Sequence, residues 1–172
     1  PMLLMGVMPV GSSSEAREGQ VIEVIRSTGE WILPLRNGLV PSKPPLYHWI
    51  GYCFSLFLGE ADEFCIRLPS LLFATGTLLL TMYLGYLIFS GGARDGSGKL
   101  SRADCRTAQD VGLLSGMILS TTYGFVRMSI DARVDMTFCF FVCAALFPVL
   151  VRLAWVDPYT RNAGRILRER DF

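Results

Sequence analysis

The chain has 172 residues, of which 51% are hydrophobic and 18% are charged, and its formal net charge is +1. Soluble domains carry about 25% charged residues, so this composition excludes an ordinary soluble domain and indicates an integral membrane protein. The near-zero net charge, without a tail rich in Lys and Arg, gives no indication of nucleic-acid binding.

Residues 1–10 are apolar but too few to cross a bilayer, which takes about 20 residues. We expect them to be the end of a first transmembrane helix. A helix is predicted over 15–28, because Ser12 and Glu15 have the spacing of a capping box and the apolar residues that follow recur at helical spacing. Gly29 is a typical residue for ending a helix. This amphipathic helix is expected to lie on the membrane surface.

Residues 30–45 contain Asn-Gly and Lys-Pro-Pro, which predict a loop. Residues 46–58 are apolar and aromatic, but so short a segment favours an interfacial or re-entrant helix over a span. The whole of 11–68 is therefore expected to be one loop on the outer side of the membrane. The alternative counts 46–58 as a span, and it would invert the topology of everything that follows.

Three further spans are predicted, at 69–90, 110–127 and 136–155. The first has no Asp, Glu, Lys, Arg or His side chain and is long enough for a bilayer core of about 30 Å. A loop at 91–109, a short outer loop at 128–135 and a tail at 156–172 complete the topology. By the positive-inside rule, the loop at 91–109 and the tail are cytoplasmic, because nine of the 16 basic residues lie in 91–109 or after residue 151: Arg94, Lys99, Arg102, Arg106, Arg152, Arg161, Arg165, Arg168 and Arg170.

Both outer segments carry acids and bases beside the membrane, where a charge without a partner is costly. They are Glu15, Arg17, Glu18 and Lys43 in the first segment, and Arg127, Arg133 and Asp135 in the second. Each has an ordinary structural explanation: helix capping for the acids, snorkelling for the arginines and solvation for the lysine. The functional alternative is a phosphate clamp made by the cations, with one acid as a general base.

His48 is the only histidine, and a lone histidine beside aromatic residues is more often an interface side chain than a ligand. No spacing of Cys, His or Asp indicates a metal site, and no glycine-rich nucleotide loop or nucleophile elbow is present. The cofactor is therefore unknown, with no divalent metal indicated by the sequence. A soluble nucleotide-sugar or ATP site is not indicated either.

Five motifs occur in a fixed order: Ser-Glu-Ala-Arg at 14–17, Thr-Gly-Glu-Trp-Ile-Leu-Pro at 28–34, Lys-Pro-Pro-Leu-Tyr-His-Trp at 43–49, Arg-Leu-Pro-Ser at 67–70 and Ala-Arg-Val-Asp-Met at 132–136. Together they resemble the start of bacterial membrane glycosyltransferases, the relatives of 4-amino-4-deoxy-L-arabinose transferase and of the protein O-mannosyltransferases. The resemblance implies an all-α integral membrane fold of the GT-C type. It also implies an active site on the periplasmic face of the inner membrane.

The resemblance implies the chemistry as well. Family members transfer a sugar from a polyprenyl-phosphate carrier to a lipid, as in lipid A modification, or to a protein. In this chain Glu15, or else Asp135, is expected to act as the general base in an inverting transfer. The residues expected to bind the donor phosphate are Arg17, Lys43, Arg133 and Arg127.

Ser14 departs from the family pattern, which usually has Asp at this position. Because a serine cannot serve as a carboxylate base, the role passes to Glu15 or is lost. The rival from another class is a non-catalytic small membrane scaffold or assembly protein, in which Glu15 and Asp135 only cap helices. Within the enzyme class, a lipid acceptor and a Ser/Thr acceptor are not separated by the sequence.

Overall fold

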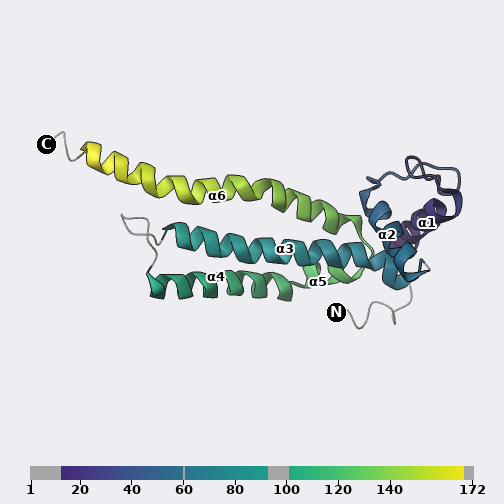
Figure 1. The fold of residues 1–172 in the computed structure, drawn as a ribbon, viewed down its shortest axis with the longest axis horizontal. Helices are drawn as coiled ribbons and strands as arrows, with labels where there is room; N and C mark the ends of the chain where they lie inside the picture. Colours follow the sequence, from purple (N-terminus) through teal and green to yellow (C-terminus); the bar gives the residue numbers. More distant parts are fainter. Residues whose placement is uncertain (1–12, 60, 93–100, 169–172) are drawn as a thin grey trace. The chain divides into compact units, whose positions relative to one another are not determined.

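In the computed structural model, residues 13–59, 61–92 and 101–168 are described, and they fold into helices joined by loops (Figure 1). The helices are α1 (Ser13–Thr28), α2 (Leu46–Leu58), α3 (Glu63–Gly92), α4 (Arg102–Thr121), α5 (Tyr123–Ile130) and α6 (Val134–Arg168). In these ranges the predicted all-helical class is confirmed. Residues 1–10, expected to end a first span, and Ser12 of the expected capping box lie outside the described residues.

The chain divides into two compact units. The first consists of Pro1–Gly76 with Thr122–Phe140, and it contains α1, α2, α5 and the first turns of α3 and α6. The second consists of Thr77–Thr121 with Phe141–Phe172, and it contains α4 and the rest of α3 and α6. Every site residue predicted from the sequence belongs to the first unit.

Helix α1 forms and ends where the sequence predicts. Gly29 follows it in the left-handed region, with φ +73°, which a residue without a Cβ adopts readily. The Gly29 N–H donates to the Ile25 carbonyl at 2.9 Å. The apolar side chains of Val21, Ile22 and Ile25 are buried. This face therefore packs against protein, and not against lipid as an amphipathic surface helix would.

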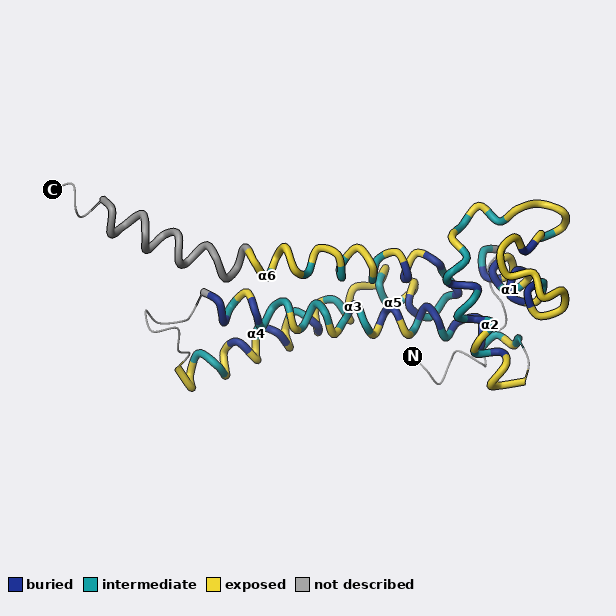
Figure 2. Tube along the Cα trace, turned by 45° about the horizontal axis from the view of Figure 1, so that its top comes forward, coloured by how far each residue is buried: buried dark blue, intermediate teal, exposed yellow. Residues whose placement is uncertain are grey.

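Helix α2 has the predicted bounds and packs closely on α1. Gly51 permits this approach, because a Cβ at that position would lie 2.4 Å from Cδ1 of Ile22. Ile22 shares a buried cluster with Tyr47 of α2 and Ile66 of α3, and the Tyr47 hydroxyl donates to the Ile66 carbonyl. The buried residues of this unit gather where α1, α2 and the start of α3 meet (Figure 2). With 13 residues, α2 is about 20 Å long and too short to cross a bilayer.

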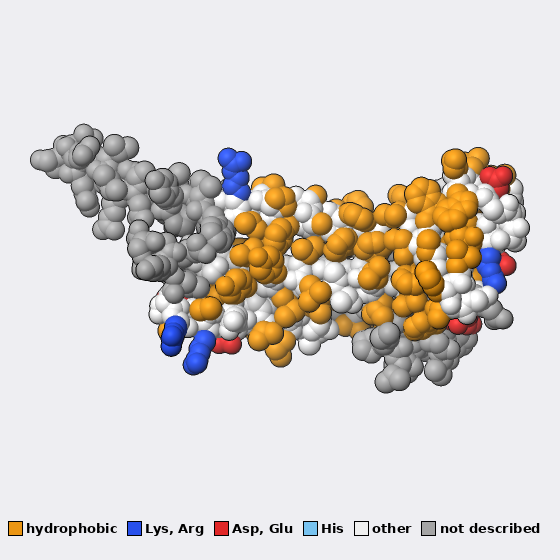
Figure 3. Space-filling model, viewed as in Figure 1, with side chains coloured by type: hydrophobic (Ala, Val, Ile, Leu, Met, Phe, Trp, Pro, Cys, Tyr) orange, Lys and Arg blue, Asp and Glu red, His pale blue; other side chains and the backbone are white. Residues whose placement is uncertain are grey.

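Two helices of the described chain are long and apolar enough to cross a membrane: Glu63–Gly91 within α3 and Val134–Arg152 within α6. Hydrophobic side chains cover much of the visible face of the long helices (Figure 3), and those of Leu79 and Phe138 are exposed. Exposed apolar faces of this kind fit a lipid environment. Helix α6 continues to Arg168, through most of the segment predicted as a tail.

The third expected span, 110–127, is not one continuous helix. Helix α4 ends at Thr121, and Thr122 has extended backbone angles before α5 begins. The hydroxyls of Ser120 and Thr121 donate to the Met117 carbonyl, and such bonds compete with the helical ladder. Four charged residues also fall in the first half of α4: Arg102, Asp104, Arg106 and Asp110.

The second unit is held together by close approach of small residues. A Cβ at Gly112 of α4 would lie 2.7 Å from the Met82 carbonyl oxygen, and one at Gly116 would lie 2.4 Å from the Met82 Cγ. Small residues one helical turn apart let two helices approach closely, as is common between membrane helices. Tyr83 of α3 stacks on Phe147 of α6, with ring centroids 5.7 Å apart.

Candidate functional site

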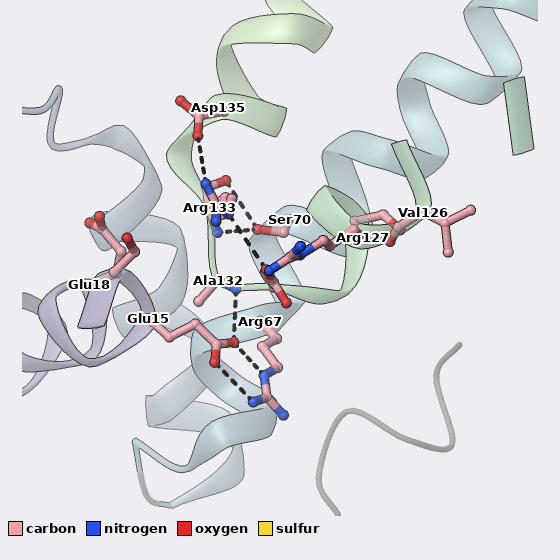
Figure 4. Close-up of polar contacts among 12 residues, drawn as sticks. Glu15, Glu18, Arg67, Ser70, Val126, Arg127, Ala132, Arg133 and Asp135 are labelled. Carbon is pink, nitrogen blue, oxygen red and sulfur yellow. Dashed lines mark hydrogen bonds and ion pairs between the residues drawn. The ribbon is translucent and has the colours of Figure 1, made fainter. Parts of the chain in front are cut away.

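The carboxylate of Glu15 joins three separate parts of the chain. Its Oε1 accepts a hydrogen bond from Arg67 Nε at 2.8 Å and another from the Ala132 backbone N–H at 3.1 Å. Its Oε2 accepts a bond from Arg67 Nη2 at 3.2 Å (Figure 4). Helix α1, helix α3 and the connection between α5 and α6 are therefore linked by one buried side chain. The two outer segments that the sequence analysis expects on one side of the membrane do meet.

The Glu15–Arg67 pair is a buried ion pair, since both side chains are almost fully covered. Burial of two charges is costly unless good geometry and further hydrogen bonds compensate. Here the compensation comes from a bidentate contact with the Arg67 guanidinium and from the hydrogen bond that the Ala132 amide donates. Arg67 has no role in the sequence analysis beyond its place in the Arg-Leu-Pro-Ser motif. Arg67 lies just before the uncharged run of α3, and this position is the sequence signal that could have identified it.

Ser70 fixes the same connection one turn further along α3. Its hydroxyl oxygen accepts the Arg133 backbone N–H at 2.9 Å, and the hydroxyl donates to the Arg133 carbonyl at 3.1 Å. Both bonds are to the backbone, so they hold the Ala132–Arg133 segment regardless of the Arg133 side chain. The Arg-Leu-Pro-Ser motif thus supplies Arg67 and Ser70 to the same contact region.

A second buried acid, Glu18, lies one turn after Glu15 and bridges a lysine and a histidine. Its Oε1 accepts from Lys43 Nζ at 2.8 Å, and its Oε2 contacts His48 Nε2 at 2.7 Å. Burial would raise the pKa of the Glu18 carboxyl, but the hydrogen bonds from His48 and Lys43 outweigh it and lower that pKa below its ordinary value. The lone histidine is therefore the buried partner of an acid, and not an interface side chain.

A pocket of about 150 Å³ opens beside this bridge, and its charged lining residues are Arg17, Glu18, Arg36 and Lys43. This cationic pocket brings together two of the residues expected to bind phosphate, Arg17 and Lys43. Arg17 also donates to the Ser14 hydroxyl at 3.2 Å. With three cations and one carboxylate, the pocket is suited to an anion.

Arg36 enters the cationic pocket because of a tight turn. Asn37 and Gly38 both have positive φ, at 52° and 77°, which is the backbone of a hairpin turn. The turn is closed by hydrogen bonds in both directions between Arg36 and Leu39, at 2.9 and 3.0 Å. The Asn-Gly dipeptide indicates a turn from the sequence alone. The sequence does not indicate on which side of the loop Arg36 lies.

Like Glu15, the three predicted residues of the second segment, Arg127, Arg133 and Asp135, do not line this pocket. Arg127 and Arg133 are 3.9 and 3.6 Å from Asp131, and Arg133 is 3.9 Å from Asp135. These are ion-pair distances longer than hydrogen bonds. Asp135 and Glu15 lie at opposite ends of the labelled cluster (Figure 4). The two acids and four cations, which were expected to form one site, therefore lie in separate groups.

No known family model, characterised protein or solved structure that was compared with this chain matches it. In the described ranges, no three side chains of His, Cys, Asp or Glu are grouped as metal ligands.

Proposed function

We propose that the chain belongs to a membrane glycosyltransferase, which moves a sugar from a polyprenyl-phosphate carrier to a lipid or protein acceptor on the outer face. The observation that carries this proposal is the cationic pocket. Arg17 and Lys43 come from two different motifs of the resemblance and line this one pocket. The candidate spans of α3 and α6 supply the membrane setting that a lipid-linked donor requires.

The cationic pocket serves the leaving group in this proposal. The acceptor oxygen forms a bond to the anomeric carbon while the bond from that carbon to the phosphate oxygen breaks, which inverts the anomeric centre. Negative charge then grows on the lipid phosphate. Arg17, Arg36 and Lys43 stabilise that charge by pre-placed hydrogen-bond donors. The acceptor proton passes to a carboxylate base.

Two carboxylates are candidates for the general base. Glu15 is the residue that the motif designates, but three hydrogen bonds from Arg67 and Ala132 already engage it. Asp135 is 57% exposed and is paired with Arg133 only at 3.9 Å. We expect Glu15→Gln to abolish transfer, and Asp135→Asn to do so if the base is Asp135 instead. Unchanged turnover in both variants would reject both assignments.

The experiment that tests the function is a transfer assay with the membrane-reconstituted protein. Radiolabelled polyprenyl-phosphate sugars are supplied with lipid and protein acceptors, and the labelled acceptor is identified. Lys43→Ala and Arg17→Ala should each reduce transfer at least tenfold. The matched control is Arg106→Ala, an exposed arginine of α4, which should transfer as the native protein does. Equal loss in all three variants would contradict a specific pocket.

One observation favours a second candidate, a membrane scaffold or assembly protein. Glu15, the acid designated by the motif, is built into a three-way contact that holds the first unit together. This is what a purely structural acid would do. The scaffold hypothesis predicts that no labelled acceptor appears with any donor and that Lys43→Ala leaves the cellular role of the protein intact.

A further inference from the structure

His48 does not line the cationic pocket, but it is joined to that pocket through one carboxylate. The His48 side chain is buried, and its Nε2 lies 2.7 Å from Oε2 of Glu18. The other oxygen of the carboxylate, Oε1, accepts a hydrogen bond from Lys43 Nζ at 2.8 Å. Glu18 and Lys43 both line the pocket. Because histidine is the residue type whose charge ordinarily changes between about pH 5 and pH 8, a titratable group is in contact with the anion site.

The contact with Glu18 determines where a proton is added to the imidazole. The pKa of the Glu18 carboxyl is lowered in spite of its burial, by hydrogen bonds from His48 and Lys43, so Glu18 is ionised at neutral pH. An ionised carboxylate only accepts hydrogen bonds, and Nε2 of His48 therefore carries the hydrogen of this contact. The proton that charges the ring then binds at Nδ1. His48 also lines a pocket of about 200 Å³, which has room for the water that delivers this proton.

The other elements around α2 contribute charged groups that are paired with one another. They are Glu15 of α1 with Arg67 of α3, and Arg133 of the connection between α5 and α6 with Asp131 and Asp135. Glu15 and Arg67 act on Tyr47, the neighbour of His48 in α2, but their charges are opposite and offset each other. Burial raises the pKa of the Tyr47 hydroxyl, so Tyr47 stays neutral where histidine titrates. Glu18 is therefore the charge that a proton on His48 affects first.

We propose that His48 is a positioning residue of the cationic pocket, which acts through Glu18: a proton on the imidazole offsets the Glu18 charge, and Lys43 then binds an anion more tightly. This inference rests on the proposed function, because it takes the cationic pocket as the phosphate site. Three cations and one carboxylate line the pocket, and the protonated imidazole adds one further positive charge beside them. Anion affinity therefore rises as the pH falls through the range in which histidine titrates. By linkage, a bound anion also raises the affinity of His48 for a proton.

The test measures the affinity for inorganic sulfate, an anion that does not itself titrate near neutral pH. Titration calorimetry is performed at constant ionic strength, with the protein in phosphatidylcholine nanodiscs, whose lipid has no net charge. His48 is the only histidine of the chain. Between about pH 8 and about pH 5.5 we expect the affinity to rise about 3- to 10-fold, the effect of one unit charge about 10 Å away in a partly solvated site. A flat affinity, or no sulfate binding at any pH, would overturn the proposal.

Variants separate the charge of His48 from its part in packing. His48→Gln keeps a side-chain N–H for Glu18 but gains no charge, so its sulfate affinity should stay at the native alkaline value throughout the range. Glu18→Gln removes the charge that a proton on His48 offsets, so at the alkaline end it should bind sulfate as tightly as the native protein does at the acid end. The matched control is Glu23→Gln, an exposed acid of the same helix, which should keep the native pH dependence. A pH-dependent His48→Gln, or weaker binding by Glu18→Gln, would reject the inference.

A measurement on the native protein tests the same linkage without any substitution. Sulfate binding is repeated in buffers of different ionisation enthalpy, which reports the protons taken up for each anion bound. We expect the uptake of a fraction of a proton in the middle of the range in which histidine titrates, and no uptake would overturn the inference. Proton-linked affinity in a protein without transfer activity would leave this inference in place and remove the enzyme. Transfer activity with a flat sulfate affinity would keep the enzyme and remove the inference.

Discussion

The Oε1 atom of Glu15 lies 3.1 Å from the backbone nitrogen of Ala132, although 117 residues separate the two in the chain. This contact places α1 directly on the connection between α5 and α6. The contact depends on Arg67, which neutralises the same carboxylate.

Removal of Arg67 alone should be strongly destabilising. Arg67→Ala leaves the buried Glu15 charge without its counter-ion, and breaking a buried pair in this way typically costs about 3–5 kcal/mol. The free energy of unfolding, measured by denaturant titration in detergent, should fall by that order. Glu15→Gln/Arg67→Met is the matched control, because it removes both charges together. A double variant as unstable as Arg67→Ala would show that the charge pair is not the cause.

The Glu18 bridge should make the first unit sensitive to acid. The pKa of the Glu18 carboxyl is lowered in the folded protein from its ordinary value of 4.5. Its stabilising contribution is therefore complete above pH 4.5 and is lost as the pH falls through the folded pKa. The native protein should lose more stability between neutral pH and pH 3 than Glu18→Gln does. Parallel stability curves for the two proteins would contradict the bridge.

Anion binding should depend on Arg36 and not on Arg127. Loss of one hydrogen bond from a charged group is worth about 1.5–3 kcal/mol, so Arg36→Ala should weaken methyl phosphate binding about 10- to 100-fold. Arg127→Ala should leave the affinity unchanged, because Arg127 does not line the pocket. The reverse result would favour the clamp that the sequence alone suggests. Calorimetry on both variants decides between them.

Packing of α1 on α2 should depend on the absence of a side chain at Gly51. Gly51→Ala places a Cβ 2.4 Å from Cδ1 of Ile22, and such overpacking typically costs about 1–3 kcal/mol. Ile22→Val removes that methyl group and should restore part of the loss. Gly19→Ala is the control within α1, since its nearest neighbour would lie at 3.5 Å. It should be neutral or mildly stabilising, as alanine favours helices over glycine.

Local structure in the first unit could be predicted because its signals are local. Gly29 ends α1, and α2 begins directly after Pro45 and ends before Gly59, which has a positive φ. Each of these residues acts through its own backbone preferences, which are properties of the residue type. Two helices were therefore predicted with bounds close to those observed.

The charge pairs could not be predicted, because each depends on contacts between distant segments. Glu18 and His48 are 30 residues apart, and Glu15 and Arg67 are 52 apart. Nothing at one position indicates which distant side chain will face it. The interruption at Thr122 was missed for a different reason. Apolar content alone suggested a continuous span, while hydroxyl bonds to the Met117 carbonyl favour a helix end.

The charges around the cationic pocket also bear on the proposed transfer. Arg17, Arg36 and Lys43 supply three positive charges and Glu18 supplies one negative charge, so the net charge of these four residues is +2. A sugar linked to a lipid through a phosphodiester carries a single negative charge, whereas a phosphate monoester carries about −1.5 to −2 at pH 7. In the proposed transfer, the spent carrier, a monoester, would match the pocket better than the donor does. Release of the spent lipid, and not bond breaking, would then be the step that limits the rate.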